Sequence, residues 1–169
     1  MSAIGRLDGV TSAGWLTPAQ EQAWRRYRRM RVLLDLQIAR DLHHDSGLSE
    51  ADYDVLSTLS EHPDDRWRAR DLAAQLLWST SRLAHHVGRM EQRGLVARQP
   101  CPGDARGAII SLTEPGRVAL RAAAPLHVAS VRRHMIDLLT DDEVAALDAI
   151  ADQVTTHLAG QPPADPPSG

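Results

Sequence analysis

The clearest hydrophobic pattern in the chain lies between Ser79 and Gly94, where Leu83, Val87 and Met90 recur at spacings of four and three residues. This spacing places the three side chains on one face of an α-helix, directed at a core. Ser79 is a good N-cap because its hydroxyl can accept a backbone N–H of the first turn, and Gly94 can adopt the left-handed conformation that ends a helix. The pattern predicts one amphipathic helix of about four turns.

The side of this helix that faces away from the core carries hydroxyl, imidazole and guanidinium groups and no acid. In the major groove of DNA, arginine can donate two hydrogen bonds to guanine, and serine or histidine can reach base edges or phosphates. Gly88 is small and lets the helix sit close to the bases. The simpler alternative is an amphipathic helix whose basic face is only solvated. The residues that we expect in the major groove are Ser79, Thr80, Ser81, Arg82, His85, His86 and Arg89.

A short helix is predicted from Arg68 to Leu77, and only a tight turn at Trp78 separates it from the helix that Ser79 begins. Two helices joined in this way form a helix-turn-helix, in which the second helix reads the major groove. The side chains of the short helix that we expect to point inward are Leu72, Ala73, Leu76 and Leu77.

Helical periodicity also precedes this pair. Thr17, Pro18 and Gln20 combine a capping hydroxyl, a proline at the first helical position and a reciprocal cap, and apolar residues then recur through to about His43. Ser49 caps a second helix after a break at Asp45-Ser46-Gly47. The core residues expected from that second helix are Val55, Leu56 and Leu59.

After Gly94 the pattern changes to two short strands, over residues 95–99 and 108–112, joined by a loop with two prolines and two glycines. A β-hairpin after a helix-turn-helix is a wing. Its Arg106 is placed for the minor groove of DNA, where a guanidinium is favoured by the groove potential. Asp104 either orients an arginine or is a solvated turn residue. The wing contacts that we expect are Arg98, Asp104 and Arg106.

Two further helices are expected at the C-terminal side. Thr113 caps the first, in which Pro125 predicts a kink and apolar positions run to Leu139, and Thr140 begins the second with a capping box. The terminal helices carry more apolar positions than a core of this size can cover, so we expect a homodimer. The expected domains are a flexible arm (1–15), a helical dimerisation region (16–45 and 114–158), a winged helix-turn-helix DNA-binding region (46–113) and a disordered tail (159–169).

The charge distribution agrees with a nucleic-acid site. The net charge is −3, yet eight arginines and only three acids lie between Arg66 and Arg106. A basic segment inside an acidic body is the electrostatic footprint of a nucleic-acid interface. All 19 basic residues are arginine, which we interpret as genome composition bias.

Other features of the composition narrow the function. A single cysteine excludes an intramolecular disulfide framework. The chain has no apolar run near 18 residues and no secretion signal, so we expect a cytoplasmic protein without a membrane partner. It also has no glycine-rich phosphate loop, nucleophile elbow or zinc-protease motif, so we expect no enzyme activity and no cofactor.

At this point the chain resembles the MarR family of bacterial transcription regulators over roughly residues 18–158. The resemblance rests on the second helix, the helix from Ser79 to Gly94, the D-x-R wing motif ending at Arg106, and the L-T-x-x-G motif ending at Gly116. It implies a mainly α fold with a small β-hairpin, an obligate homodimer with intertwined terminal helices, and a palindromic operator. It also implies repression relieved by a small, often phenolic, ligand and a minor-groove role for Arg106. Where the family often has T-R in the recognition helix, this chain has Ala84-His85.

Several residues admit other interpretations. Cys101, expected on the wing loop, could serve a redox switch, although no base is adjacent in sequence. Four histidines could converge on zinc but are more often satisfied by backbone or water: His43, His44, His127 and His134. Four aromatic residues could line a pocket for a small aromatic effector or simply be core residues: Trp15, Trp24, Tyr27 and Trp67.

We expect a dimeric transcriptional repressor that binds double-stranded DNA. Ser81, Arg82 and His85 would read bases, and Arg106 would read the minor groove. Phosphate contacts would supply most of the affinity. The alternatives are a winged-helix protein-interaction module that does not bind DNA, and a redox-responsive regulator acting through Cys101.

Overall fold

The computed structural model describes residues 14–101 and 104–160. For residues 104–106 it describes the backbone alone. The chain divides into two compact units, residues 1–36 and 37–169. The expected flexible arm therefore lies outside the described residues up to residue 13, as does the expected disordered tail from residue 161 onward.

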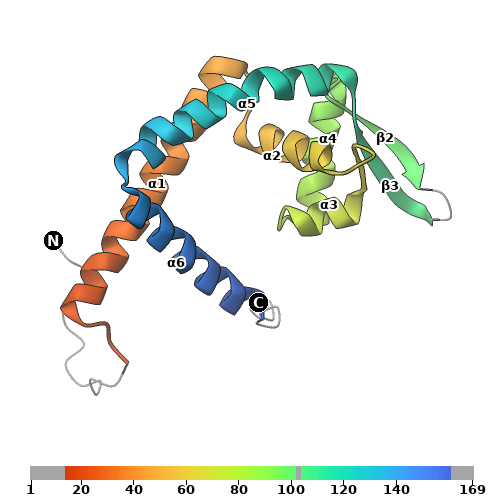
Figure 1. The fold of residues 1–169 in the computed structure, drawn as a ribbon. Helices are drawn as coiled ribbons and strands as arrows, with labels where there is room; N and C mark the ends of the chain where they lie inside the picture. The colour runs from red at the N-terminus through yellow and green to blue at the C-terminus, as the bar shows by residue number, and fades with distance from the viewer. Residues whose placement is uncertain (1–13, 102–103, 161–169) are drawn as a thin grey trace. The chain divides into compact units, whose positions relative to one another are not determined.

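The described chain is mainly helical with one small sheet (Figure 1). Its elements follow in the order α1 (Pro18–Ser46), α2 (Glu50–Glu61), β1 (Arg66–Arg68), α3 (Ala69–Gln75), α4 (Thr80–Gln92), β2 (Val96–Cys101), β3 (Asp104–Leu112), α5 (Glu114–His134), the 3-10 helix η1 (Ile136–Leu138) and α6 (Asp141–Ala159). The prediction of a mainly α fold with a winged helix-turn-helix is confirmed.

The helix starts follow the capping residues that the sequence indicates. The Thr17 N–H donates to Gln20 Oε1 at 2.8 Å before α1. Ser49 and Asp52 form a reciprocal capping box at the start of α2. Thr140 and Glu143 do the same for α6. These side chains satisfy backbone N–H groups that the first turn of a helix leaves without partners.

The sheet has three antiparallel strands in the order β1-β3-β2, so the wing is more than the expected hairpin. β1 pairs with β3 in a register that puts Trp67 opposite Ile110. Because Arg68 belongs to this strand, the prediction that the short helix begins at Arg68 is wrong by one residue. The loop between β2 and β3 is also shorter than expected, because β2 continues to Cys101 and β3 begins at Asp104.

The core of the second unit lies between α2, α3, α4, the sheet and α5, and its largest fully buried side chains include Leu56, Leu72, Leu83 and Met90. Leu77 is a correction. Its side chain is 93 % exposed because the chain leaves α3 after Gln75 and Leu77 takes a left-handed conformation with φ of +54°.

The C-terminal segments differ from the prediction in one respect. α5 contains Pro125 and ends at His134, followed by η1, whereas one helix to Leu139 was expected. The kink at Pro125 stays a prediction. None of the helices in the described ranges is long and apolar enough to cross a membrane.

Candidate nucleic-acid interface

The recognition helix α4 has the inner face that its periodicity predicts. Leu83, Val87 and Met90 are each at most 1 % exposed. Ser79 is the N-cap, and its Oγ accepts the Arg82 N–H at 3.2 Å. Gly94 has φ of +73° just beyond the helix, which is the left-handed conformation expected of it. These contacts fix the orientation of α4 about its own axis.

Six of the seven residues expected in the major groove are exposed on this helix or its cap. The members of this outer face are Ser79, Thr80, Ser81, Arg82, His85 and Arg89. No acidic residue lies in the first turn of α4. The positive end of the helix dipole and the side-chain charges therefore have the same sign at this end of the helix.

His86 is the exception, and the prediction that it faces outward is wrong. His86 is 7 % exposed, and its Nε2 lies 3.1 Å from Oδ1 of Asp52 in α2. A residue at the border between the apolar and polar faces of a helix is buried or exposed according to the side chains that other elements pack against it. Here the neighbour is a buried carboxylate 34 positions earlier in the sequence, which helical periodicity does not reveal.

Asp52 is the centre of the charged contacts below α4. Its side chain accepts a hydrogen bond from Arg93 Nη1 at 2.7 Å, and its Oδ2 accepts the Ser49 N–H at 3.0 Å. Burial pushes the pKa of Asp52 upward, but hydrogen bonds from Arg93 and Ser49 outweigh it and the net pKa is lowered. Burial lowers the pKa of His86, against the opposite influence of Asp52.

Arg82 has a support of its own. Its guanidinium carbon lies 4.2 Å from the centroid of the Trp78 ring, a cation–π geometry. Trp78 occupies the tight turn before α4, and its ring also meets His86 edge-on at a centroid distance of 5.4 Å. The residue that the sequence marked only as a turn therefore orients a candidate base-reading arginine.

The wing residues are described to different extents. Arg98 is exposed on β2, and its backbone N–H donates to Glu91 Oε1 at 3.2 Å. Asp104 and Arg106 belong to β3 by their backbone, but their side chains lie outside the described part of the structure. Their predicted pairing and the minor-groove role of Arg106 stay predictions.

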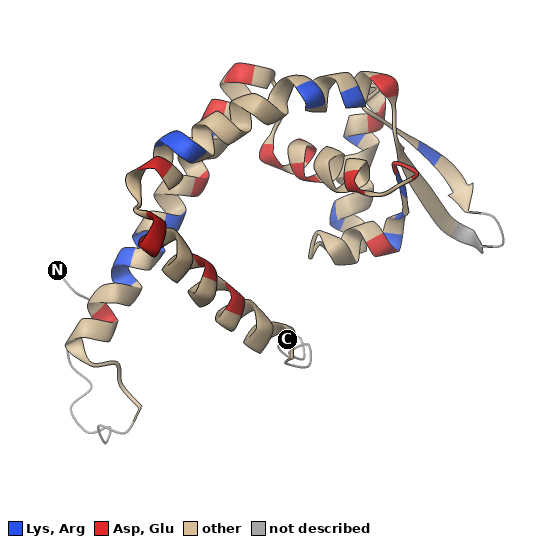
Figure 2. Cartoon of the chain, viewed as in Figure 1, with Lys and Arg blue, Asp and Glu red and all other residues tan. Residues whose placement is uncertain are grey.

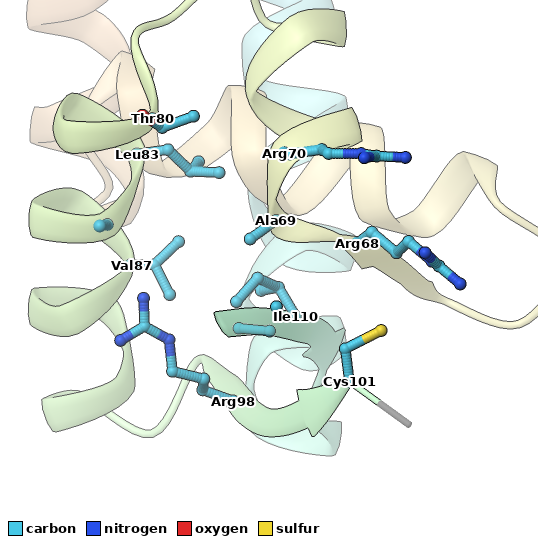
Figure 3. Close-up of a pocket in the computed structure, with 12 residues that line it drawn as sticks. Arg68, Ala69, Arg70, Thr80, Leu83, Val87, Arg98, Cys101 and Ile110 are labelled. Atoms are coloured by element: carbon cyan, nitrogen blue, oxygen red, sulfur yellow. The ribbon is translucent and has the colours of Figure 1, made fainter. Parts of the chain in front are cut away.

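A pocket of about 300 Å³ lies between α4 and the wing. Leu83 and Val87 of α4 point across it toward Ala69 and Ile110, and the side chains of Arg68, Arg70 and Arg98 lie around it (Figure 3). Arg68 and Arg70 are exposed, and only Arg98 was among the expected contacts. The alternation of Arg66, Trp67 and Arg68 is the one sequence signal for a strand with outward-facing arginines. Three residues are too few for periodicity to identify such a strand.

Cys101 also lines this pocket, at the end of β2. It is 6 % exposed, so its expected position on an open wing loop is wrong. β2 extends two residues beyond its expected end at Gln99, which places Cys101 in the strand. Burial removes the accessibility that a redox-sensing thiol needs.

The aromatic and histidine candidates are dispersed. In the first unit, Trp24 stacks on Tyr27 at a centroid distance of 5.6 Å, and Trp15 is 55 % exposed. In the second unit, Trp67 meets His62 edge-on. His44 contacts Asp45 and His134 contacts Asp41, and among the described residues no group of three or more metal-ligating side chains comes together. The aromatic effector pocket stays a prediction.

The helix pair and the three-stranded wing together define a winged helix-turn-helix protein. A family model described as MarR family matches residues 46–107. The transcriptional regulator HosA of Escherichia coli O111:H- is 33 % identical over 100 residues, which cover 59 % of this chain and 73 % of that protein. The chain therefore belongs to the MarR family of transcriptional regulators and is not an enzyme.

Two solved structures from Streptomyces coelicolor are similar over most of their length. The MarR family regulator AbsC is 44 % identical with a TM-score of 0.81, and the match covers 87 % of this chain and 99 % of AbsC. Sco3205, solved in complex with DNA, is 38 % identical with a TM-score of 0.83, covering 90 % of this chain and 98 % of Sco3205. These identities extend the likeness from the fold to the sequence.

Proposed function

We propose that this regulator represses transcription as a homodimer on a palindromic operator in double-stranded DNA. The observation that carries the proposal is the exposed polar face of α4, which has no acid in its first turn and lies beside a wing. Sco3205, which shares this fold and 38 % of its sequence, was solved with DNA. Ser81, Arg82 and His85 would read base edges, and Ser79, Thr80 and Arg89 would contact bases or phosphates nearby.

The phosphate backbone would pass over the pocket between α4 and the wing. Arg68, Arg70 and Arg98 are among the residues that line this pocket, and three arginines on adjoining elements of one surface favour a polyanion. Arg106, with Asp104 orienting an arginine, would enter the minor groove from the wing. Most of the binding free energy would then come from phosphate contacts, and the base contacts would set the sequence preference.

Exposed apolar residues support a homodimer. α6 has no buried residue along its 19 positions, although Ile150, Val154 and Leu158 are 61 %, 50 % and 59 % exposed. In α1, Trp24 and Leu33 are 52 % and 55 % exposed. Such faces are unfavourable in water and are covered in many proteins by a second copy. We assign residues 16–45 and 114–158 to dimerisation and residues 46–113 to DNA binding.

Charge on α6 is consistent with this assignment. Acidic residues recur along α6 at Asp141, Asp142, Glu143, Asp148 and Asp152 (Figure 2). These acids would repel DNA phosphates, which argues that α6 serves assembly rather than DNA contact. In a two-fold symmetric dimer, the two recognition helices would lie about one DNA turn, roughly 34 Å, apart.

Release of DNA by a small aromatic effector is the finer part of the proposal. The stacked and exposed pair Trp24 and Tyr27 offers an aromatic surface on which such a molecule could bind. Trp15 belongs to the same unit as this pair, and Trp67, in the second unit, is the fourth aromatic residue of the predicted set. Thermal unfolding with phenolic compounds, repeated on Trp24→Ala, tests this part: a rise in Tm that the variant abolishes supports the assignment.

A salt titration tests the proposed function. A duplex is first selected from random DNA with the full chain, and its Kd is then measured between 50 and 300 mM salt. A repressor should show a log–log slope of about −0.9 for each phosphate neutralised.

The variant Arg106→Ala should cost about 1–3 kcal/mol of binding free energy. Arg132→Ala is the control for the loss of one positive charge, because Arg132 is exposed, lies outside the DNA-binding residues 46–113 and pairs with Asp137 of η1; this variant should leave Kd unchanged. Salt-insensitive or absent duplex binding would favour a protein-interaction module instead.

A further inference from the structure

The imidazole of His86 contacts charged groups on two elements. On α4 itself, Arg89 Nη2 lies 2.9 Å from His86 Nδ1. On α2, Asp52 Oδ1 lies 3.1 Å from His86 Nε2. The approach of Asp52 is off the N–H direction, so this contact is electrostatic rather than a well-aligned hydrogen bond. His86 therefore connects an exposed arginine of the recognition helix to a buried carboxylate beneath it.

The chemistry of these groups assigns the proton on the ring. A guanidinium has only N–H donors, so Nδ1 of His86 must accept from Arg89 and cannot carry a proton. The proton of the neutral ring is then on Nε2, the nitrogen that faces the Asp52 carboxylate. A second proton would have to enter at Nδ1, where it would meet the positive charge of Arg89.

The buried Asp52 beneath His86 is held in place by several contacts. Asp52 is 3 % exposed, belongs to the capping box of α2 and accepts a hydrogen bond from Arg93. The His86 ring is also held by the edge of the Trp78 indole. A side chain with fixed partners on several sides offers its remaining acceptor in one direction only, which is the condition for holding a flexible arginine in place.

We propose that His86 is a positioning residue for DNA recognition, which holds the Arg89 guanidinium on the outer face of α4 through its unprotonated Nδ1. This inference rests on the proposed function. Arg89 has four further N–H donors, and fixing one of them reduces the rotamer freedom that is lost when the others meet a phosphate or base. The orientation of Arg89 is thus set from α2, on the side of the helix that DNA would not touch.

Acidification provides a readout that a purely structural role would not share. The charged groups that influence His86 are Asp52 and Asp54 of α2 and Arg82 and Arg89 of α4, and Arg93, at the end of α4, pairs with the same Asp52. His127 of α5 influences the same Asp54. Protonation of His86 removes the acceptor at Nδ1 and repels Arg89, so the DNA affinity that depends on Arg89 should fall at acid pH.

The experiment measures Kd for the duplex selected with the full chain, by fluorescence anisotropy, for five proteins: wild type, Arg89→Ala, His86→Leu, the double variant and His86→Gln. Arg89→Ala should weaken binding about tenfold, the loss of one charge-assisted hydrogen bond. His86→Leu should weaken binding by a similar factor, and the double variant should bind no more weakly than Arg89→Ala alone. Such non-additivity shows that His86 acts through Arg89.

His86→Gln is the matched control, because an amide also offers one acceptor and one donor but does not titrate. It should keep most of the affinity at pH 7.5. Because burial lowers the pKa of His86, the ratio of the wild-type Kd to the His86→Gln Kd should rise several-fold at the acid end of a titration from pH 7.5 to pH 5. His85 and the other histidines are common to both proteins and cancel in that ratio. This comparison stands even where His86→Leu does not fold.

The outcomes separate the two proposals. Additive losses in the double variant, or parallel pH profiles of wild type and His86→Gln, overturn the role of His86. An Arg89→Ala variant that binds as wild type does overturns this inference alone, because salt-sensitive binding by the wild type would still support the proposed function. Absence of any salt-sensitive binding by the wild type overturns both.

Discussion

Arg82 lies with its guanidinium carbon 4.2 Å from the centre of the Trp78 ring, so the residue of the tight turn supports the third residue of the recognition helix. Arg82 makes this contact while remaining exposed on the outer face of α4. A stacked guanidinium keeps its N–H groups at the rim of the ring, where they remain available for a base or a phosphate. The turn between α3 and α4 therefore shapes the interface as well as linking the helices.

Replacing Trp78 by leucine should weaken DNA binding about two- to fivefold, because a cation–π contact at an exposed site contributes about 0.5–1 kcal/mol. Arg82→Lys is the matched variant: it keeps the charge but loses the planar stack, and should weaken binding similarly with little change in stability. Kd by anisotropy and the free energy of unfolding in urea check both. Full affinity in a folded Trp78→Leu protein would contradict the role of the stack.

Replacing Leu77 by glycine should raise the free energy of unfolding by about 0.5–1 kcal/mol, because Leu77 has φ of +54° and the left-handed conformation strains a residue with a Cβ. Little burial is lost, since the side chain is 93 % exposed. Leu76→Gly is the control: Leu76 has φ of −81° and is partly buried, so that variant should be less stable than wild type. Urea denaturation of the three proteins measures the difference, and a loss of stability in Leu77→Gly would refute the account.

Gly116→Ala should destabilise the protein by about 2–3 kcal/mol or more. Gly116 lies in the first turn of α5, and a Cβ there would collide with the backbone carbonyl of Leu95, just before β2, and meet Leu112 Cδ1 at 3.0 Å. Backbone atoms of an adjoining segment cannot yield as a side-chain tip does. Chemical denaturation is the measurement.

Gly88→Ala is the matched control for Gly116→Ala. A Cβ at Gly88 meets nothing within 4 Å, so this variant should gain up to about 1 kcal/mol of helix stability. If α4 lies close to the bases, the same methyl group should nonetheless lower DNA affinity. Equal stability of the two alanine variants would show that the close approach at Gly116 is not needed.

Acid should weaken the contact between the end of α1 and α5. Hydrogen bonds from Ser130 first, and then His134, lower the pKa of Asp41 from 3.8 to about 2. A carboxyl whose pKa is lowered on folding stabilises the protein above its unfolded pKa, and that contribution is lost as the pH falls from about 4 towards 2. Ser130→Ala removes the main cause and should flatten this part of the pH dependence. Urea unfolding at pH 6, 4 and 3 tests it, and parallel curves for the two proteins would contradict the assignment.

Local signals explain how much of the site could be predicted. The helix from Ser79 to Gly94 was predicted correctly because its cap, its end and its apolar stripe all lie within one short segment. The family resemblance also rested on contiguous motifs, and the family is confirmed. The dimer, the base contacts and the wing arginine stay proposals, since they depend on a partner subunit or on DNA.

The errors have a common physical cause. His86 was expected on the surface because a helical wheel does not include the buried Asp52 on another helix. The strand at Arg66–Arg68 was missed because its pairing partner is β3, more than 40 positions later. Leu77 was expected inside because helical periodicity does not indicate that the chain leaves the helix after Gln75.

By itself, the sequence determined the capping residues at which α1, α2, α4, α5 and α6 begin, the apolar stripe of the recognition helix, and that a basic helix-turn-helix precedes a β-hairpin, because capping and periodicity act between residues a few positions apart. Only the tertiary structure decided that one histidine of the recognition helix faces inward, that Trp78 supports Arg82, and that three arginines surround one pocket. Those relationships join residues from different elements, and their geometry exists only once the elements have packed against one another.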